Sequence, residues 1–444
     1  MSLSINSYNF NNYRVTPPKT GKVSFGMDKE SPGEVNEKVY SKAKHVQPAS
    51  IALGSINTRT SLFTDSEREK YALVSASLRP ETKAALNRIL QSGKLLNTNS
   101  NDGSSTLDNL CKMLDENNPR IKGLDASTLV DEVITAIDDP YKITQKFGDI
   151  PDKVAENVSK NILTGIKDPD SIKNVRSTTC AAASLEFTTA NKQPAEFARM
   201  VEGLSSQNYT VLKDIKIFDA KDSLSQKIAK VNHRKELFEM FNLPYKINQN
   251  GTATVKISPD RNAIVRARVQ TSCRDKGERS VSDVLMQSAI MQVASQETYN
   301  ALNGFRTGSL NNDNEGLTEY EKTFAEEIIT GNERYSVIYQ KLDGNSKLQG
   351  FTHSPEATLS HIKEGLNAGA DIVVGITEFN KDGVCTNGHE ITIVDVVKGE
   401  DGKEMFVYND TDDGLDEPRT APVEEMLPKI HHAGIPQELV SRLK

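Results

Sequence analysis

One short segment carries the strongest chemical signal in this chain, and it reads Ser177-Thr178-Thr179-Cys180-Ala181-Ala182-Ala183-Ser184-Leu185-Glu186-Phe187. Small polar residues lead into an alanine-rich run, which predicts a helix whose first amides are capped by a Ser or Thr side chain. Cys180 then lies in the first turn, where the positive end of the helix dipole favours a thiolate. The segment predicts either a cysteine nucleophile or, as for most free cysteines, a small buried apolar residue.

The composition is that of a soluble protein with an ordinary core. The chain has 444 residues, of which 36% are hydrophobic and 26% are charged, and this length suits two or three domains. The net charge of -7 gives no reason to expect nucleic acid or an anionic membrane as a partner. Neither a membrane-length apolar run nor a basic-then-apolar signal peptide is found, so we expect a cytoplasmic protein or export by a signal-independent route.

Three regions follow from the changes in pattern along the chain. Residues 1–60 mix Asn, Ser, Lys and Pro without periodicity, which predicts a disordered leader. Residues 61–170 carry helical patterns, with helix starts at Pro80 and behind Ser105, and predict a helical bundle domain that is a candidate pro-region or regulatory region. Residues 171–444 mix helices and strands and predict an α+β domain with a helical lobe and an antiparallel β lobe.

The β lobe is predicted from a meander between residues 370 and 414. Apolar runs at 372–377, 389–397 and 404–410 are separated by Asp-Gly turns, which are strong hairpin signals. Further upstream, apolar residues at 253–257 and the alternation at 264–269 predict two more strands. The meander places His389 at the start of its middle strand.

The residue that orients His389 is expected on the next strand, at Asn409 or Asp410. A two-residue loop at Asp401-Gly402 places Asp410 on the same face of the sheet as His389, whereas a three-residue loop that adds Glu400 places Asn409 there. The hairpin signal favours Asp410 and leaves Asn409 as the alternative third member.

The order Cys180, His389 and then Asn409 or Asp410 resembles the papain-like cysteine peptidase superfamily, in a divergent, bacterial-type form. The resemblance implies a two-lobed fold with the cysteine and the histidine across a cleft. It also implies an oxyanion donor six residues before the cysteine, where this chain has Asn174. The chain departs from the family in the residues that flank the cysteine, Thr179 and Ala181, and in having no tryptophan.

The resemblance implies a cysteine peptidase that forms a thioester acyl-enzyme on a peptide or protein substrate, without a metal or other cofactor. Two alternatives remain open. The same triad can serve a glutamine deamidase or acyltransferase, and an inactive papain-like fold can act as an interaction protein.

The other cysteines and a histidine pair have weaker signals. Cys385 lies near His389 in a predicted turn and is a rival nucleophile without a helix dipole, whereas Cys111 and Cys273 are predicted to be structural. His431-His432 is predicted to be a surface pair at the end of a helix.

Overall fold

The computed structural model describes residues 63–147, 150–173, 177–273, 278–306, 316–412, 415 and 417–440. The predicted leader at residues 1–60 lies outside these ranges. The helices are α2 (Asp65–Ser77), α3 (Pro80–Gln91), α4 (Thr106–Leu114), α5 (Ala126–Asp138), α6 (Asp152–Ser159), α7 (Pro169–Ile172), α8 (Cys180–Lys192), α9 (Pro194–Ser205), α10 (Leu224–Met240), α11 (Ala263–Cys273), α12 (Val281–Ala294), α13 (Glu319–Thr330), α14 (Pro355–Asn367), α15 (Val423–Met426) and α16 (Gln437–Val440).

The strands form one large sheet and three small ones. They are β1 (Val211–Lys216), β2 (Tyr245–Ile247), β3 (Thr252–Ile257), β4 (Tyr299–Asn300), β5 (Phe305–Arg306), β6 (Arg334–Ile338), β7 (Gln340–Leu342), β8 (Leu348–Phe351), β9 (Ile372–Phe379), β10 (Cys385–Lys398), β11 (Glu404–Asn409), β12 (Arg419–Pro422) and β13 (Ile430–Pro436). Every pairing between these strands is antiparallel, and the large sheet has the order β12-β11-β10-β9-β13-β6. The predicted α+β class and the predicted meander, here β9-β10-β11, are confirmed.

The N-terminal helices begin where local chemistry favours a helix start. Pro80 is at the first position of α3, and Ser105 caps α4 in a capping box with Asp108. Thr64 and Glu67 form a second capping box at the start of α2. These interactions satisfy the first amides of each helix, which otherwise lack partners.

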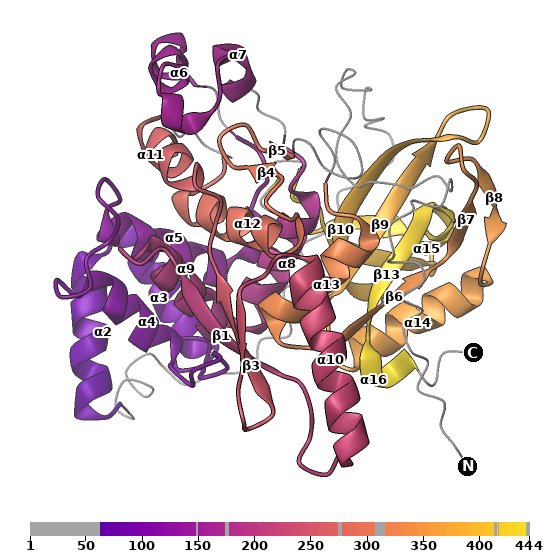
Figure 1. Ribbon diagram of the computed structural model, residues 1–444, viewed down its shortest axis with the longest axis horizontal. Helices are drawn as coiled ribbons and strands as arrows, with labels where there is room; N and C mark the ends of the chain where they lie inside the picture. Colours follow the sequence, from indigo (N-terminus) through magenta and orange to yellow (C-terminus); the bar gives the residue numbers. More distant parts are fainter. Residues whose placement is uncertain are drawn as a thin grey trace.

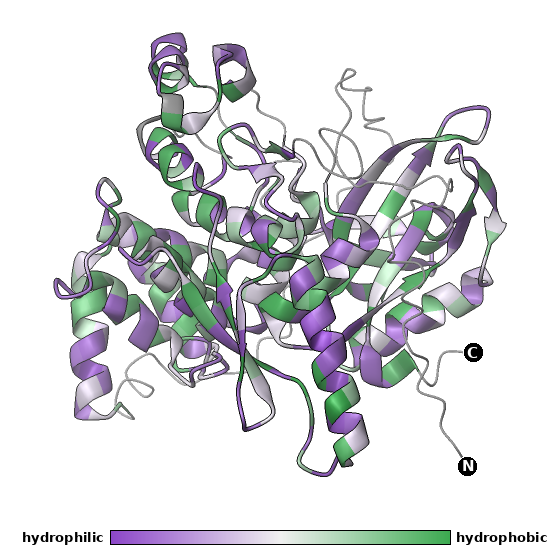
Figure 2. Cartoon of the chain, viewed as in Figure 1, coloured by the Kyte–Doolittle hydropathy of each residue, from purple (hydrophilic) through white to green (hydrophobic). Residues whose placement is uncertain are grey.

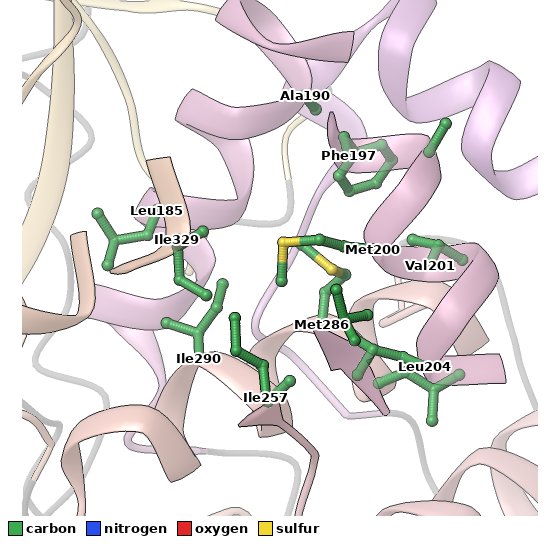
Figure 3. Packing of buried hydrophobic residues seen from close by; sticks show 14 of the residues in the cluster. Leu185, Ala190, Phe197, Met200, Val201, Leu204, Ile257, Met286, Ile290 and Ile329 are labelled. Atoms are coloured by element: carbon green, nitrogen blue, oxygen red, sulfur yellow. The ribbon is translucent and has the colours of Figure 1, made fainter. Parts of the chain in front are cut away.

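Residues 61–170, predicted as a helical domain, share much of their hydrophobic core with later parts of the chain. Their apolar side chains belong to the same buried cluster as those of α8, α9 and α12, with α4 packed on α9 and α5 on α12 (Figure 1). Figure 3 shows part of this cluster from close by, with labelled side chains that include Leu185, Phe197, Met200, Ile257, Met286, Ile290 and Ile329. This segment therefore contributes to the same core as α8, and its role as a pro-region or regulatory region stays a prediction.

We therefore expect the fragment 171–444 to lose its compact fold. This fragment lacks helices α2 to α5, whose side chains Leu110, Leu129 and Val133 are at most 1% exposed in the full chain. Their loss exposes the apolar side chains that they cover. Truncation of one large core side chain costs roughly 2–5 kcal/mol, and whole domains are stable by only about 5–15 kcal/mol. Size-exclusion chromatography and thermal melting by circular dichroism test this, with the fragment 63–444 as matched control. A monomeric 171–444 that melts cooperatively near the temperature of the control would contradict it.

The large sheet has a second hydrophobic cluster of its own. Ile391 and Phe406 are completely buried in it, together with Ile362 of α14, which packs on this sheet. In Figure 1 the sheet lies on one side of the molecule, the N-terminal helices lie on the other, and α8 runs between them. The centre of the molecule is thus a helix that contacts the sheet through β10.

The predicted strand at 264–269 is wrong, because these residues belong to helix α11. The buried face of α11 includes Arg266, which is completely buried and stacks on the ring of Phe147 at 3.6 Å, and Gln270, which is 2% exposed. The buried residues of α11 recur every three to four positions, as in a helix, but Arg266 and Gln270 among them are polar. The apolar residues alone therefore alternate as in a strand, which misled the prediction.

Peripheral helices carry more hydrophilic residues. Helix α10 alternates hydrophilic and hydrophobic residues in Figure 2, and Leu224 and Ile228 on it are exposed. Within the described ranges, every helix is too short or too polar to cross a membrane.

Candidate active site

Cys180 is the first residue of helix α8, as the sequence predicts. Every residue from Cys180 to Ala190 is buried, so α8 is held on all sides by the protein. Cys180 itself is 1% exposed. This burial fixes the position of the helix N-terminus, and with it the position of the thiol.

The residues before Cys180 are held by a buried arginine. Arg279 Nη2 donates to Ser177 Oγ at 2.8 Å and to Thr179 Oγ1 at 2.5 Å, and Thr179 Oγ1 in turn donates to Gln287 Oε1 at 3.0 Å. The expectation that this Ser/Thr run caps the helix is wrong for Thr179, whose hydroxyl is turned into the protein. The positive end of the α8 dipole is therefore not offset by the N-cap side chain, which suits binding of a negative oxygen.

His389 and Asp410 form a partly buried pair. His389 Nε2 lies 2.7 Å from Asp410 Oδ1, which also accepts the amide of Asp412 at 3.0 Å. Burial raises the pKa of Asp410, but the charge of His389 and these hydrogen bonds bring it below its usual value. Asp410 is therefore a carboxylate that holds the imidazole in one orientation.

A β-bulge, rather than the hairpin loop, places Asp410 on the face of His389. Gly399 bonds to Lys403, so the loop has three residues, the form expected to favour Asn409. The register shifts between Ile393 and Asp395, and beyond this bulge Thr392 pairs with Asn409. One extra residue turns every later side chain to the opposite face. Asn409 thus faces away from His389 and is buried at 1% exposure.

His389 also interacts with Cys180, although 209 residues of sequence separate them. Because Asp410 occupies Nε2, Nδ1 is the nitrogen that remains for the thiol. Burial lowers the pKa of His389, but the Asp410 charge, its hydrogen bond and the interaction with Cys180 raise it well above its ordinary value. The surroundings of the imidazole thus favour its protonated form more than those of an ordinary histidine do. The three predicted residues Cys180, His389 and Asp410 therefore meet at one place.

The thiol of Cys180 packs against Leu342 and Cys385. Cys385 lies at the start of β10, and its Sγ donates to the carbonyl oxygen of Asn387 at 3.3 Å. Burial raises the pKa of the Cys385 thiol, so at neutral pH it is the less reactive neighbour. Cys111, by contrast, packs at the edge of the first hydrophobic cluster on α4, and the side chain of Cys273 lies outside the described part of the chain.

Two residues near the site were missed by sequence reasoning. Gln145 bridges the two halves of the site through its backbone. Its backbone carbonyl oxygen accepts from Ser177 Oγ at 2.9 Å, and its backbone amide donates to the carbonyl oxygen of Thr411 at 3.0 Å. Arg279 is the second. Neither follows a motif, and only the fold brings them to Cys180. The predicted oxyanion donor Asn174 lies outside the described residues.

The predicted surface pair His431-His432 is wrong, because both residues are buried in strand β13. His432 Nε2 lies 2.9 Å from Glu390 Oε1, and both side chains are completely buried. Burial raises the pKa of Glu390, but the charges of His432 and Lys322 bring it below its usual value. Glu390 follows His389 on β10, and His432 lies beside this buried carboxylate as its neighbour from β13.

The described residues contain no group of three or more His, Cys, Asp or Glu side chains that is arranged to hold a metal ion. No family model, no curated protein and no solved structure matches this chain. The chemistry of the site is therefore argued from its geometry.

Proposed function

We propose that this chain is a cysteine peptidase with a papain-like arrangement of Cys180, His389 and Asp410. The observation that carries the proposal is the meeting of three side chains at one imidazole: Asp410 lies on Nε2 of His389 at 2.7 Å, and the same ring interacts with Cys180 at the N-terminus of α8. This is the set of groups that nucleophilic catalysis by cysteine requires: a thiolate, a base that exchanges its proton, and a residue that orients the base.

The wider arrangement supports the same proposal. Helix α8 belongs to the helix-rich part of the molecule, and His389 belongs to the antiparallel sheet, so the reacting pair comes from two different structural parts. The papain-like superfamily has this two-lobed organisation. The origin of the pair in two parts of the molecule supports the proposed likeness, which was first suggested by the order of the three residues.

In the proposed reaction the Cys180 thiolate attacks the carbonyl carbon of a peptide bond. The His389 imidazolium gives its proton to the leaving amine, which leaves a thioester on Cys180. The neutral imidazole then takes a proton from water, whose oxygen attacks the thioester and releases the acid. Asp410 keeps the ring in place through both steps.

The negative oxygen of the tetrahedral intermediate needs donors at the N-terminus of α8. The backbone amide of Cys180 is one donor in the proposal, with Asn174 or the Gln145 side chain as the second. Gln145 supports this role by its position, since it contacts residues on both sides of the site and is 1% exposed.

The first test is the rate of iodoacetamide alkylation of each cysteine against pH, read by mass spectrometry. An ordinary thiol is less than about 1% thiolate at pH 6, whereas a thiolate paired with an imidazolium persists there. We expect Cys180 to react on the order of 10²-fold faster at pH 6 in the wild type than in His389→Ala, after allowance for the lower intrinsic reactivity of paired thiolates.

Cys111 serves as the internal standard in the same spectra, since its rate is not expected to change in His389→Ala. Equal Cys180 rates in the two proteins at pH 6 would sink the proposal and favour an inactive interaction protein. Chain cleavage of a protein substrate, rather than a mass gain of about 1 Da at glutamine, then distinguishes a peptidase from a deamidase with the same triad.

A further inference from the structure

A second thiol lies beside the proposed nucleophile. Cys385 packs directly against Cys180, with Leu342 as the other apolar neighbour. The two cysteines come from different elements, the start of α8 and the start of β10, and are 205 residues apart in the sequence. The hydrolytic mechanism uses only Cys180, so the second thiol has no part in it.

The surroundings of Cys385 favour its neutral thiol form. Its Sγ donates a hydrogen bond to the Asn387 carbonyl, and partial burial disfavours its thiolate form. Cys180, which interacts with the protonated His389, is the thiol that an oxidant meets as a nucleophile. One reactive and one resting thiol in contact are the arrangement in which a sulfenic acid is captured by a neighbour.

The start of β10 is irregular where it carries Cys385. The register of β10 against β9 shifts between Cys385 and Asn387, so Cys385 is at the irregular end of the strand. A disulfide needs its two Cα atoms about 4.4–6.8 Å apart. The packing of Cys385 against Cys180 is the contact on which a bond between the two sulfur atoms depends.

We propose that Cys385 is the resolving cysteine of a peroxide-modification site, in which oxidised Cys180 forms a reversible disulfide with Cys385. The inference rests on the proposed function in one respect only, since it requires the reactive Cys180 thiolate. The oxidant it takes is a hydroperoxide, and hydrogen peroxide is the simplest member of that class.

The chemistry balances in two steps. In the first, the Cys180 thiolate attacks one peroxide oxygen, the O–O bond breaks, and the His389 imidazolium protonates the leaving hydroxide, which gives Cys180–SOH, water and a neutral imidazole. In the second, Cys385 attacks the sulfenic sulfur, its thiol proton passes to the departing hydroxide through the neutral imidazole, and a disulfide and a second water form. One peroxide takes two electrons, one from each sulfur.

The disulfide blocks the nucleophile and protects it. While the bond is present Cys180 cannot attack a carbonyl, and a dithiol reductant restores it by exchange. Without a resolving thiol, the sulfenic acid is oxidised further to sulfinic acid, which such reductants do not reverse. Cys385 therefore converts permanent inactivation into a reversible one.

The test is peroxide treatment of the reduced full-length chain, followed by alkylation, trypsin digestion without reductant, and mass spectrometry. We expect a species that joins the tryptic peptides 177–192 and 382–398, a loss of 2 Da in the intact protein, and a fall of at least about 10-fold in Cys180 alkylation that dithiothreitol reverses. In Cys385→Ser we expect dimedone, when present, to trap Cys180 as sulfenic acid, and in its absence we expect Cys180 to gain about 32 Da as sulfinic acid.

Cys111→Ser is the matched control, and it is expected to form the same joined peptides as the wild type. The proposal is overturned if wild-type Cys180 alkylates fast at pH 6 but goes to sulfinic acid without the joined species, and in that case the proposed hydrolase function still stands. It is overturned together with that function if Cys180 reacts with neither iodoacetamide nor peroxide. A wild type and a Cys385→Ser variant that yield identical products also overturn it.

Discussion

Replacement of Cys180 by alanine is expected to abolish peptide-bond hydrolysis, with a fall in kcat of about 10⁴-fold or more. In the proposed mechanism the Cys180 sulfur is the only protein atom that forms a covalent bond to the substrate, and no other group of the site can take its place. Cys385 touches Cys180 but its thiol is held as a hydrogen-bond donor to Asn387. The measurement is the release of new N-termini from an unfolded protein substrate, compared between the wild type and Cys180→Ala.

The matched control is Cys111→Ala, which removes a half-buried thiol from α4 at the edge of the first hydrophobic cluster. It is expected to retain hydrolysis within about twofold, since removal of a partly exposed side chain costs little. Substrate binding should survive in Cys180→Ala, because alanine has no larger volume than cysteine. If Cys180→Ala keeps wild-type hydrolysis while Cys385→Ala loses it, the roles of the two thiols are reversed.

The sequence alone was sufficient to predict three residues that the structure brings together, because each has a local signal. Cys180 begins an alanine-rich helix, His389 begins a strand, and the Asp-Gly turns place a third strand beside it. The choice of Asp410 was predicted for a reason that the structure contradicts. The hairpin loop has three residues, and the bulge at Val394 corrects the parity. A bulge of this kind leaves no mark in the sequence that we could read.

Longer-range contacts were the main source of error. The face of α11 that packs inward contains Arg266, whose Nη1 donates to the Ile172 carbonyl at 3.0 Å, so a charged residue occupies a core position. His432 is buried for the same kind of reason, because Glu390 from another strand lies beside it. A polar residue is predicted to be exposed unless a partner for it is known. In these two cases the partner comes from a distant part of the chain, so the sequence pattern does not reveal it.

The second large effect is expected for Asp410→Ala. Loss of the carboxylate should lower kcat by about 10²–10⁴-fold, since the imidazole is no longer held toward the thiol. It should also change the pH dependence. The charge of Asp410 is the largest of the influences that raise the pKa of His389, so without it the imidazolium is lost at lower pH and the alkaline limb of activity moves down. A profile of kcat/KM against pH measures both effects.

The pH dependence of folding stability gives an independent check on the direction of the pKa shifts of His389 and Asp410. The raised pKa of His389 contributes stability that is complete below the unfolded value of about 6.5 and is lost as pH rises through the folded pKa. The lowered pKa of Asp410 contributes stability that is complete above about 3.9 and is lost as pH falls through its folded pKa. Urea unfolding should therefore show the greatest difference between wild type and Asp410→Ala, roughly 1–3 kcal/mol, between about pH 4 and 6.5.

Asn409→Ala separates this effect from general damage to strand β11. Asn409 is the adjacent residue and is more deeply buried, but it pairs with Thr392 and faces away from His389. Its removal is expected to lower stability by an amount that is the same at pH 5 and pH 8, because the amide does not titrate, and to leave the alkaline limb in place. If Asn409→Ala moves that limb and Asp410→Ala does not, Asn409 is the orienting residue. The bulge at Val394 puts Asp410, and not Asn409, on the face of His389. That result would therefore mean that the active protein pairs β10 and β11 without this bulge.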